Sequence, residues 1–459
     1  MIEIKGRRTV PAGESLRILH TSDWHLGRDL ADVDRTEDYA QMLSWLLSVI
    51  RERRIDALLV AGDVFDTPMP PSSAQKLYFD FLAEAARTDL IGVVVAAGNH
   101  DSQRFLSAPR GLLSVVRCAV STERAEDEAV VLRDASGRAL LGVAAVPYLR
   151  EGDVRMTNAD MDEADRARFW EAGVAERYAG VQERLRMALK GEAAPLIAMG
   201  HLFVTGARPS ARLLKQGAGD PSHYVGSLRN VGAEAFGAGW RYAALGHIHE
   251  AQAVKAPDAG YEIRYSGSPL MLDFTHERYR HQVEIVEVPA DGAVSIEILD
   301  VPQPRLVRTL RGGLDKLLAG IAEAGRQCPG AIVSCVADCG SSVAERRIAS
   351  AALEEAARTA GVHLGPVVTA AQARARDDEP PLKRLDDITP LEVFEDVLSA
   401  AGDMAPEKRA KLEALFAEAE ASARDAMAAE QAVSEARLGT GGLQRAAAPA
   451  GRKADVCRE

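Results

Sequence analysis

The sequence has little cysteine and no long apolar run. Its 459 residues include five cysteines, and none of them stands in a CxxC pair. Neither a disulfide framework nor a zinc ribbon is therefore indicated, and we expect Cys328, Cys335 and Cys339 to be free thiols. No stretch approaches the roughly 18 uninterrupted apolar residues of a membrane helix, and residues 1–16 carry no apolar signal segment. These absences predict a cytoplasmic protein without membrane contact.

The chain also lacks a surplus of basic residues. Lys and Arg number 55 against 67 Asp and Glu, and the formal net charge is -12. Affinity for nucleic acid normally depends on a basic face, so this balance disfavours a protein that binds nucleic acid alone. A local basic patch, bound metal ions or a basic partner could still offset the charge. There is no Gly-Lys pair, which excludes a Walker A phosphate loop.

Short apolar runs alternate with helical patterns from residue 16 onward. Strands are predicted at the segments LRILHTSD, DALLVAGD and IGVVVAAGNHD. Between them lie two stripes of apolar residues at helical spacing: Tyr39, Met42, Leu43, Leu46, Leu47 and Ile50, then Ala74, Leu77, Tyr78, Phe81 and Leu82. This βαβαβ order predicts an α/β protein whose parallel strands are covered by helices.

The rest of the chain divides into further regions. Strands are predicted at 139–149, 195–201, 240–247, 261–269 and 280–288, and the last two should be antiparallel because no long helix separates them. A strand, a helix at 344–360 and another strand then predict a small α+β unit. The expected regions are an N-terminal extension at 1–15, the α/β domain at 16–300, the α+β unit at 301–375, two helices within 385–420 and a disordered tail at 421–459.

Polar side chains follow five of the predicted strands at their carboxyl ends. They are Asp23 and His25, then Asp63, then Asn99, His100 and Asp101, then His201, and finally His247 and His249. Each alone could belong to an ordinary turn, but open α/β sheets place their sites at this edge, and five such coincidences favour one site. A glycine precedes four of these groups, at positions 62, 98, 200 and 246, which lets backbone and ligands approach closely. In an extended chain His247 and His249 would face one side, with Ile248 in the apolar layer.

These residue types favour a particular metal chemistry. Two aspartates, an asparagine oxygen and four histidines are too many ligands for one tetrahedral zinc. They suit two ions that share a carboxylate, and mixed nitrogen and oxygen donors fit manganese, iron or zinc better than calcium or magnesium. Two ions about 4 Å apart can hold a water nucleophile and neutralise a phosphate oxygen. The set therefore predicts phosphoester hydrolysis.

The ordered motifs D-x-H, G-D, G-N-H-D, G-H and G-H-x-H resemble the calcineurin-like metallophosphoesterases. The resemblance implies layered β-sheets flanked by helices. It implies that Asp63 bridges two ions, one held with Asp23, His25 and His249 and the other with Asn99, His201 and His247. His100 would contact the scissile phosphate and protonate or stabilise the leaving oxygen. Asp101 would either orient His100 or have a purely structural role.

The flanking segments LRILHTSDWHLG, DALLVAGDVFDTPMPPSSAQKLY, YAALGHIHEAQ and RYSGSP resemble the SbcD family, the nuclease subunits of bacterial SbcCD complexes. This resemblance implies a Mn²⁺-dependent 3'-to-5' exonuclease on double-stranded DNA that also opens hairpins as an endonuclease, in DNA repair, recombination and replication near the nucleoid. Residues 301–375 would be the family's capping domain. Where some relatives carry a histidine, this chain has Asp66, so no second phosphate-contacting imidazole is expected there.

The same resemblance implies partners. A coiled-coil ATPase of the SbcC type would bind the helices within 385–420, and the nuclease would form a homodimer within a heterotetramer. The docking residues would be Leu391, Phe394, Leu398, Leu412 and Phe416, which could instead pack on the chain's own core. The family dimerises through helices after the second and third strands, so Leu77, Tyr78 and Phe81 could be interface or core.

Two other functions stay open at this point. The chain could be a metallophosphoesterase that acts on a small nucleotide or another phosphodiester, because the core motifs do not select a substrate. It could also be a scaffold without activity, although every ligand position is filled.

Overall fold

The computed structural model describes residues 1–122, 124–154, 163–205, 207, 230–256, 258–338 and 343–369, together with Leu412 and Phe416. All elements below belong to one compact unit, Met1–Pro381. Leu412 and Phe416 are helical and partly buried, whereas Leu391, Phe394, Leu398 and the predicted tail lie outside the described residues. No described helix is both long and apolar enough to span a bilayer.

A six-stranded sheet contains the first three predicted strands. Its order is β15-β14-β2-β3-β4-β5, in which β2 to β5 run parallel and β14 runs antiparallel to both β2 and β15. The strands are β2 (Leu16–Thr21), β3 (Ala57–Ala61), β4 (Gly92–Ala96), β5 (Cys118–Val120), β14 (Gln282–Val288) and β15 (Ser295–Asp300). Every residue of β3 and β4 is buried, as expected for parallel strands covered on both faces.

A seven-stranded sheet contains four of the five remaining predicted strands of the α/β domain, and the fifth, at 280–288, is β14 of the six-stranded sheet. Its order is β1-β6-β7-β8-β11-β13-β12. The strands are β1 (Ile2–Lys5), β6 (Ala129–Arg133), β7 (Ala139–Ala145), β8 (Leu196–His201), β11 (Tyr242–Gly246), β12 (Gln252–Ala253) and β13 (Glu262–Tyr265). Strand β13 runs parallel to β11, so the expected antiparallel orientation is confirmed for β14 and wrong for β13.

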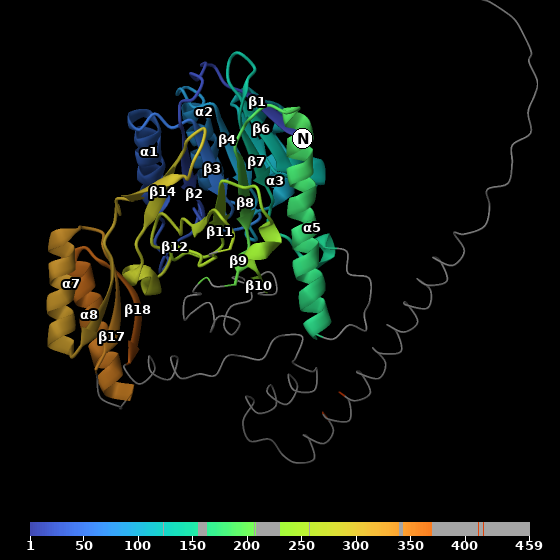
Figure 1. Cartoon of the computed structure of the whole chain (residues 1–459). Helices are drawn as coiled ribbons and strands as arrows, with labels where there is room; N and C mark the ends of the chain where they lie inside the picture. Colours follow the sequence, from blue (N-terminus) through green and yellow to red (C-terminus); the bar gives the residue numbers. More distant parts are fainter. Residues whose placement is uncertain are drawn as a thin grey trace, which may run out of the picture. The chain divides into compact units, whose positions relative to one another are not determined.

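The two sheets face each other between outer helices, which gives four layers (Figure 1). An apolar layer between the sheets includes Ile18, Val94 and Met199. Helices α1 (Thr36–Glu52) and α2 (Ser72–Ala85) bury their apolar stripes against the six-stranded sheet. The 27-residue helix α5 (Glu163–Leu189), which the sequence reading missed, covers the seven-stranded sheet. The predicted layered α/β arrangement is therefore confirmed.

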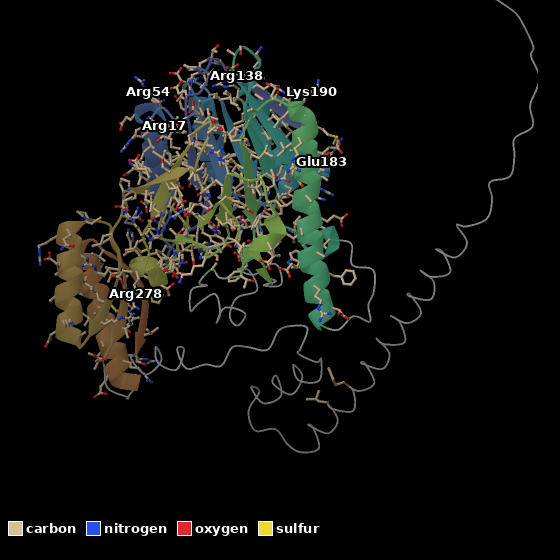
Figure 2. All side chains as sticks on the ribbon, viewed as in Figure 1. Arg17, Arg54, Arg138, Glu183, Lys190 and Arg278 are labelled. Atoms are coloured by element: carbon tan, nitrogen blue, oxygen red, sulfur yellow. The ribbon has the colours of Figure 1, made fainter. Side chains whose placement is uncertain are left out.

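An apolar stripe on helix α5 explains its position against the seven-stranded sheet. Trp170, Val174, Tyr178, Val181 and Leu185 repeat at helical spacing and are buried against the seven-stranded sheet. Glu183 and Lys190 lie on the outward side of the molecule (Figure 2).

Shorter elements connect these layers. They are α3 (Gln103–Ser107), α4 (Arg110–Val115), the 3₁₀ turns η1 (Ala125–Glu128), η2 (Glu151–Asp153), η4 (Ala233–Phe236) and η5 (Phe274–Arg278), and the paired strands β9 (Phe203–Val204) and β10 (Asn230–Val231).

A separate three-stranded parallel sheet with two helices follows residue 301. Its elements are β16 (Val307–Gly312), α7 (Leu314–Gln327), β17 (Ile332–Ala337), α8 (Val343–Ala360) and β18 (His363–Thr369). The sequence reading found the last three of them and missed β16 and α7. Buried Asp38 on α1 accepts hydrogen bonds from Arg35 at 2.9 Å and from Arg305 at 3.0 Å, which joins this unit to the α/β domain.

Burial distinguishes core from interface on α2. Tyr78 and Phe81 lie on the buried face of this helix and belong to the core, while Leu77 is partly buried. The described cysteines Cys118, Cys328 and Cys335 are free thiols, and Cys339 lies outside the described residues.

Residues 1–15 are part of the fold. Strand β1 pairs in parallel with β6, with Ile4 opposite Leu132, at the edge of the seven-stranded sheet. Ile4 and Val10 are buried in the layer between the sheets. The expectation of an appended extension is therefore corrected: the segment supplies an edge strand, because alternate side chains of a strand face the core.

Replacing Ile4 by Ala should lower the free energy of unfolding by about 2–4 kcal/mol, because the side chain is fully packed and its loss leaves a cavity. Ile4 is only 5% exposed. Urea denaturation measures the change, with Lys5→Ala as the control because Lys5 is exposed on the same strand. Equal stabilities of the two variants would contradict a packed β1.

Candidate metal centre

The structure brings the predicted ligand residues together at the carboxyl ends of strands from both sheets. Strands β2, β3 and β4 lead to Asp23 and His25, to Asp63 and to Asn99, and they belong to the six-stranded sheet. Strand β8 ends at His201 and β11 ends just before His247, and both belong to the seven-stranded sheet. The donor atoms of Asp23, His25 and His249 lie within 4.8 Å of one another, as do those of Asp23, Asp63 and His201 and those of His25, Asp63 and His100.

Asp63 lies at the centre of this cluster. Its Oδ1 accepts a hydrogen bond from the backbone N–H of His100 at 2.9 Å. Its Oδ2 lies 3.3 Å from His201 Nε2 and 3.5 Å from His25 Nε2. One carboxylate oxygen is therefore held by the backbone, while the other faces two imidazoles from different sheets.

Asn99 forms a second meeting point. Its Oδ1 lies 3.1 Å from His201 Nε2 and 3.0 Å from His247 Nδ1. His201 Nδ1 lies 2.8 Å from the Ala61 carbonyl oxygen, which can only accept, so Nδ1 carries a proton. In the neutral ring this leaves the Nε2 lone pair facing Asn99 and Asp63.

Asp23 is held by hydrogen bonds from His247 and Ser22. Both of its carboxylate oxygens accept from the His247 backbone N–H, at 3.1 and 3.2 Å, and Ser22 donates to Oδ2 at 2.5 Å. His249 Nε2 lies 3.8 Å from Asp23 Oδ1. His247 and His249 therefore lie beside different residues, Asn99 and Asp23.

The backbone at these residues departs from regular structure. Asp23, His25, Asp63 and His247 have φ values of 53°, 48°, 48° and 95°, in the region that side chains disfavour. Such strain gathers at functional sites, where surrounding contacts hold it. The expectation of an extended chain through residues 247–249 is therefore wrong, because β11 ends at Gly246. Ile248 is fully buried in an apolar cluster, and this cluster lies between α5 and the seven-stranded sheet.

Two glycines are required by close approach. A Cβ on Gly98 would lie 2.0 Å from Asp63 Oδ1, and a Cβ on Gly62 would lie 2.1 Å from His201 Nδ1. Gly62 also has a φ of +92°. These contacts confirm the expected reason for glycine before the candidate ligands.

Burial and neighbouring charges shift the protonation equilibria of the cluster. Burial opposes ionisation of Asp63, but His201 and His100 hold its pKa well below the usual range. Burial also opposes a charged His201, yet Asp63 and other acceptors raise the pKa of His201 to about 9. Burial, followed by the charge of His201, lowers the pKa of His247 to about 3. Two adjacent histidines thus favour opposite charge states.

His100 and its neighbour Asp101 have different hydrogen-bond partners. His100 Nδ1 bonds to the backbone carbonyl of Asp66 at 2.8 Å. Asp101 instead accepts from the backbone N–H groups of Val64, Phe65 and Gly98 at 3.1, 3.0 and 2.9 Å. Of the two expected roles for Asp101, these bonds favour the structural one, because both carboxylate oxygens already accept from the backbone.

The residues fit divalent metal ions. His25 Nε2 is buried and has no hydrogen-bond partner among the residues that the structure describes, although it points toward Asp63. A buried nitrogen without a partner is costly and indicates a missing ligand. The neighbouring carboxylates and imidazoles, with the amide oxygen of Asn99, supply the other donors of a metal site.

Sequence reasoning missed residues that surround the cluster. The Tyr148 ring lies 5.9 Å from the His247 ring and 6.3 Å from the His201 ring, measured between centroids. Buried His276 lies 5.3 Å from the ring of His249. Tyr148 follows β7, so the rule that strand ends carry site residues could have found it. His276 stands on η5, where the sequence carried no such signal.

A model of the calcineurin-like phosphoesterase family matches residues 16–251. The chain therefore belongs to the calcineurin-like phosphoesterases, as its motifs predicted.

More detailed similarity comes from individual proteins. SbcD of the SbcCD nuclease from Escherichia coli K12 is 32% identical over 312 residues, which cover 67% of this chain and 74% of that protein. The SbcD proteins of Bacillus subtilis and Rhodobacter capsulatus are each 32% identical and cover 62% and 64% of this chain, and 69% and 71% of their own lengths. Within its class, the chain belongs to the SbcD family.

Divalent metal ions should bind more tightly as the pH rises from about 7 to about 9. The pKa of His201 is raised from 6.5 to about 9. The charged ring therefore stabilises the metal-free fold fully below 6.5, and this contribution is lost as the pH rises through about 9. A metal ion at Nε2 must displace that proton, so affinity should rise by up to about tenfold per pH unit for one proton.

Calorimetric titration of the metal-free chain with Mn²⁺ in buffers of different ionisation enthalpy measures the released proton. The absence of proton release at pH 7.5 would contradict the raised pKa of His201. At about pH 10 the ring has already lost this proton, so no release is expected there.

Proposed function

We propose that this chain is the nuclease subunit of an SbcCD-type complex. It hydrolyses phosphodiester bonds of DNA with two divalent metal ions, most suitably Mn²⁺, as a 3'-to-5' exonuclease on double strands and an endonuclease on single strands and hairpins. The observation that carries the proposal is the cluster of donor atoms around Asp63, in a chain that is 32% identical to a named SbcCD nuclease protein over 74% of its length.

The proposed ligand sets follow the grouping of the side chains. Asp23, His25 and His249 lie together and would hold one ion. Asn99, His201 and His247 meet at Asn99 Oδ1 and would hold the other. Asp63 would belong to both, because its Oδ2 lies between His25 Nε2 and His201 Nε2.

The residues divide the chemistry between them. Bound ions would lower the pKa of a water nucleophile and neutralise charge on the phosphate. His100 is partly exposed beside His25, with ring centroids 4.8 Å apart, so it can reach a substrate phosphate. Its Nδ1 is occupied by the Asp66 carbonyl, which leaves Nε2 to donate a proton to the leaving oxygen.

We further propose that this chain binds an SbcC-type coiled-coil ATPase and a second copy of itself. The ATPase supplies the nucleotide chemistry that this sequence lacks, since it has no Gly-Lys pair. Exposed apolar residues support the homodimer: Leu112 and Val115 on α4 are 72% and 71% exposed, and Met69, just before α2, is 89% exposed. The family dimerises through the helices that follow its second and third strands. In this chain α2 follows β3 and α4 lies after β4.

Replacing His100 by Ser should abolish cleavage of labelled duplex and hairpin DNA by the chain with Mn²⁺ and the ATPase, because the leaving oxygen loses its proton donor. The metal content of the purified variant should stay near that of the unchanged chain. Asp63→Asn is the matched control, and it should lose both metal and cleavage. Hydrolysis of bis-p-nitrophenyl phosphate or a cyclic nucleotide, with no DNA cut under any metal, would reject the nuclease proposal.

Replacing Leu112 by Asp should convert the dimer to a monomer, because the change places a charge in an apolar interface. Light scattering on the purified chain measures the mass. Ile348→Asp is the control, because Ile348 is 67% exposed on α8 and lies outside the proposed interface. A dimer that persists in the Leu112 variant and dissociates in the Ile348 variant would refute this placement.

A further inference from the structure

Within the described turn between β3 and α2, Asp66 is the acidic side chain that has no place in the proposed ligand sets and is not the proposed proton donor. It follows Asp63 by three residues, in the turn that connects β3 to α2. Its backbone N–H donates to the Leu26 carbonyl at 3.3 Å, and Leu26 and Phe65 form an isolated parallel bridge. The turn that carries Asp66 is thereby fixed against the turn that carries His25.

Asp66 contacts two functional histidines by different parts of the same residue. Its carboxylate Oδ1 lies 3.0 Å from His25 Nδ1. Its backbone carbonyl lies 2.8 Å from His100 Nδ1. His25 and His100 both contact Asp66 through Nδ1, so Nε2 of each ring remains available for a metal ion or a substrate.

A partly buried arginine, Arg28, holds the Asp66 carboxylate in place. Arg28 Nη1 donates to Asp66 Oδ1 at 2.9 Å, and Arg28 Nε donates to the Leu272 carbonyl at 3.1 Å. The side chains of Arg28 and Asp66 are each only 18% exposed. Asp66 Oδ1 therefore lies within hydrogen-bond distance of both a guanidinium N–H and the His25 ring, which places the carboxylate as an acceptor.

We infer that Asp66 is a positioning residue that orients His25 toward its ion through the side chain and His100 toward the phosphate through the main chain. This inference rests on the proposed function, because it assumes that His25 binds metal and that His100 donates a proton. The physical reason is tautomer selection: a carboxylate can only accept, so it keeps the proton on His25 Nδ1 and the lone pair on Nε2. That Nε2 is the buried nitrogen without a partner.

The two contacts respond differently to mutation. A substitution at Asp66 removes the carboxylate but retains the backbone carbonyl. His25 then loses its orientation, while His100 keeps the acceptor at its Nδ1. The variant should therefore bind one ion weakly. At a metal concentration high enough to fill that site, it should still perform the chemical step.

Asp66→Ala should weaken one of two Mn²⁺ binding events in the metal-depleted full chain by about 10- to 100-fold, as loss of a carboxylate behind a metal-binding histidine does elsewhere. Asp66→Asn, which keeps an acceptor oxygen without the charge, should fall between Ala and the unchanged chain. Calorimetric titration measures both, and the second binding event should be unaffected. At saturating Mn²⁺ the kcat of DNA cleavage should return close to the unchanged value.

Asp29→Asn is the matched control. Asp29 is exposed and lies close enough for Asp66 to affect its pKa, yet it makes no described bond to His25. It removes the same charge from the same neighbourhood, so its Mn²⁺ titration should match that of the unchanged chain. Thermal unfolding of the metal-free variants identifies a merely structural effect, which would lower the melting temperature and leave a kcat that Mn²⁺ does not restore.

Three outcomes would overturn the inference: an unchanged Mn²⁺ titration for Asp66→Ala, equal weakening by Asp29→Asn, or a low kcat that persists at saturating Mn²⁺. Failure of the proposed function gives a different result, because the unchanged chain itself would then bind no Mn²⁺ or cut no DNA.

Discussion

A buried polar network between the two sheets determines how their strand ends meet. Tyr242 donates to Glu284 at 2.8 Å and lies 2.9 Å from His20 Nδ1, and Arg264 donates to Glu284 at 2.9 Å. His20 and Glu284 belong to the six-stranded sheet, whereas Tyr242 and Arg264 belong to the seven-stranded sheet. Apolar packing has no direction, but buried hydrogen bonds fail if the sheets slide. The site depends on this placement because each sheet supplies part of it.

The same placement allows the site to keep a strained backbone. Asp23, His25 and His247 each have a positive φ, which costs on the order of 1 kcal/mol or more per residue. Each is held by another strand's turn: the backbone N–H of Asp23 donates to Gly62, that of His25 donates to Asp63, and that of His247 donates to Asp23. The turns after β2, β3 and β11 thus hold one another, and the side chains are aimed before any ligand arrives.

Local periodicity made much of this fold predictable, and non-local pairing set the limit. The stripe of α1 and the apolar runs of β3 and β4 are short-range signals, and the shared carboxyl edge of parallel strands was enough to bring Asp63 and His201 together. Which sheet a strand joins is decided by distant partners, so the parallel pairing of β13 was not foreseen, and the layered sheets were expected only from the family resemblance. Helix α5 did carry a helical stripe, but it lies among many charged residues.

Asp66 and Asp101 show why residue type alone does not give a role. Both are aspartates that follow a candidate ligand in a short turn. Asp101 meets backbone N–H groups, some of them 36 and 37 residues away, and burial together with the charge of Asp63 raises its pKa to about 6. Asp66 meets an imidazole 41 residues away and a guanidinium, and its pKa falls. The donor that each carboxylate meets comes from another segment, so a motif can locate the acid, but only the packed turns determine what it does.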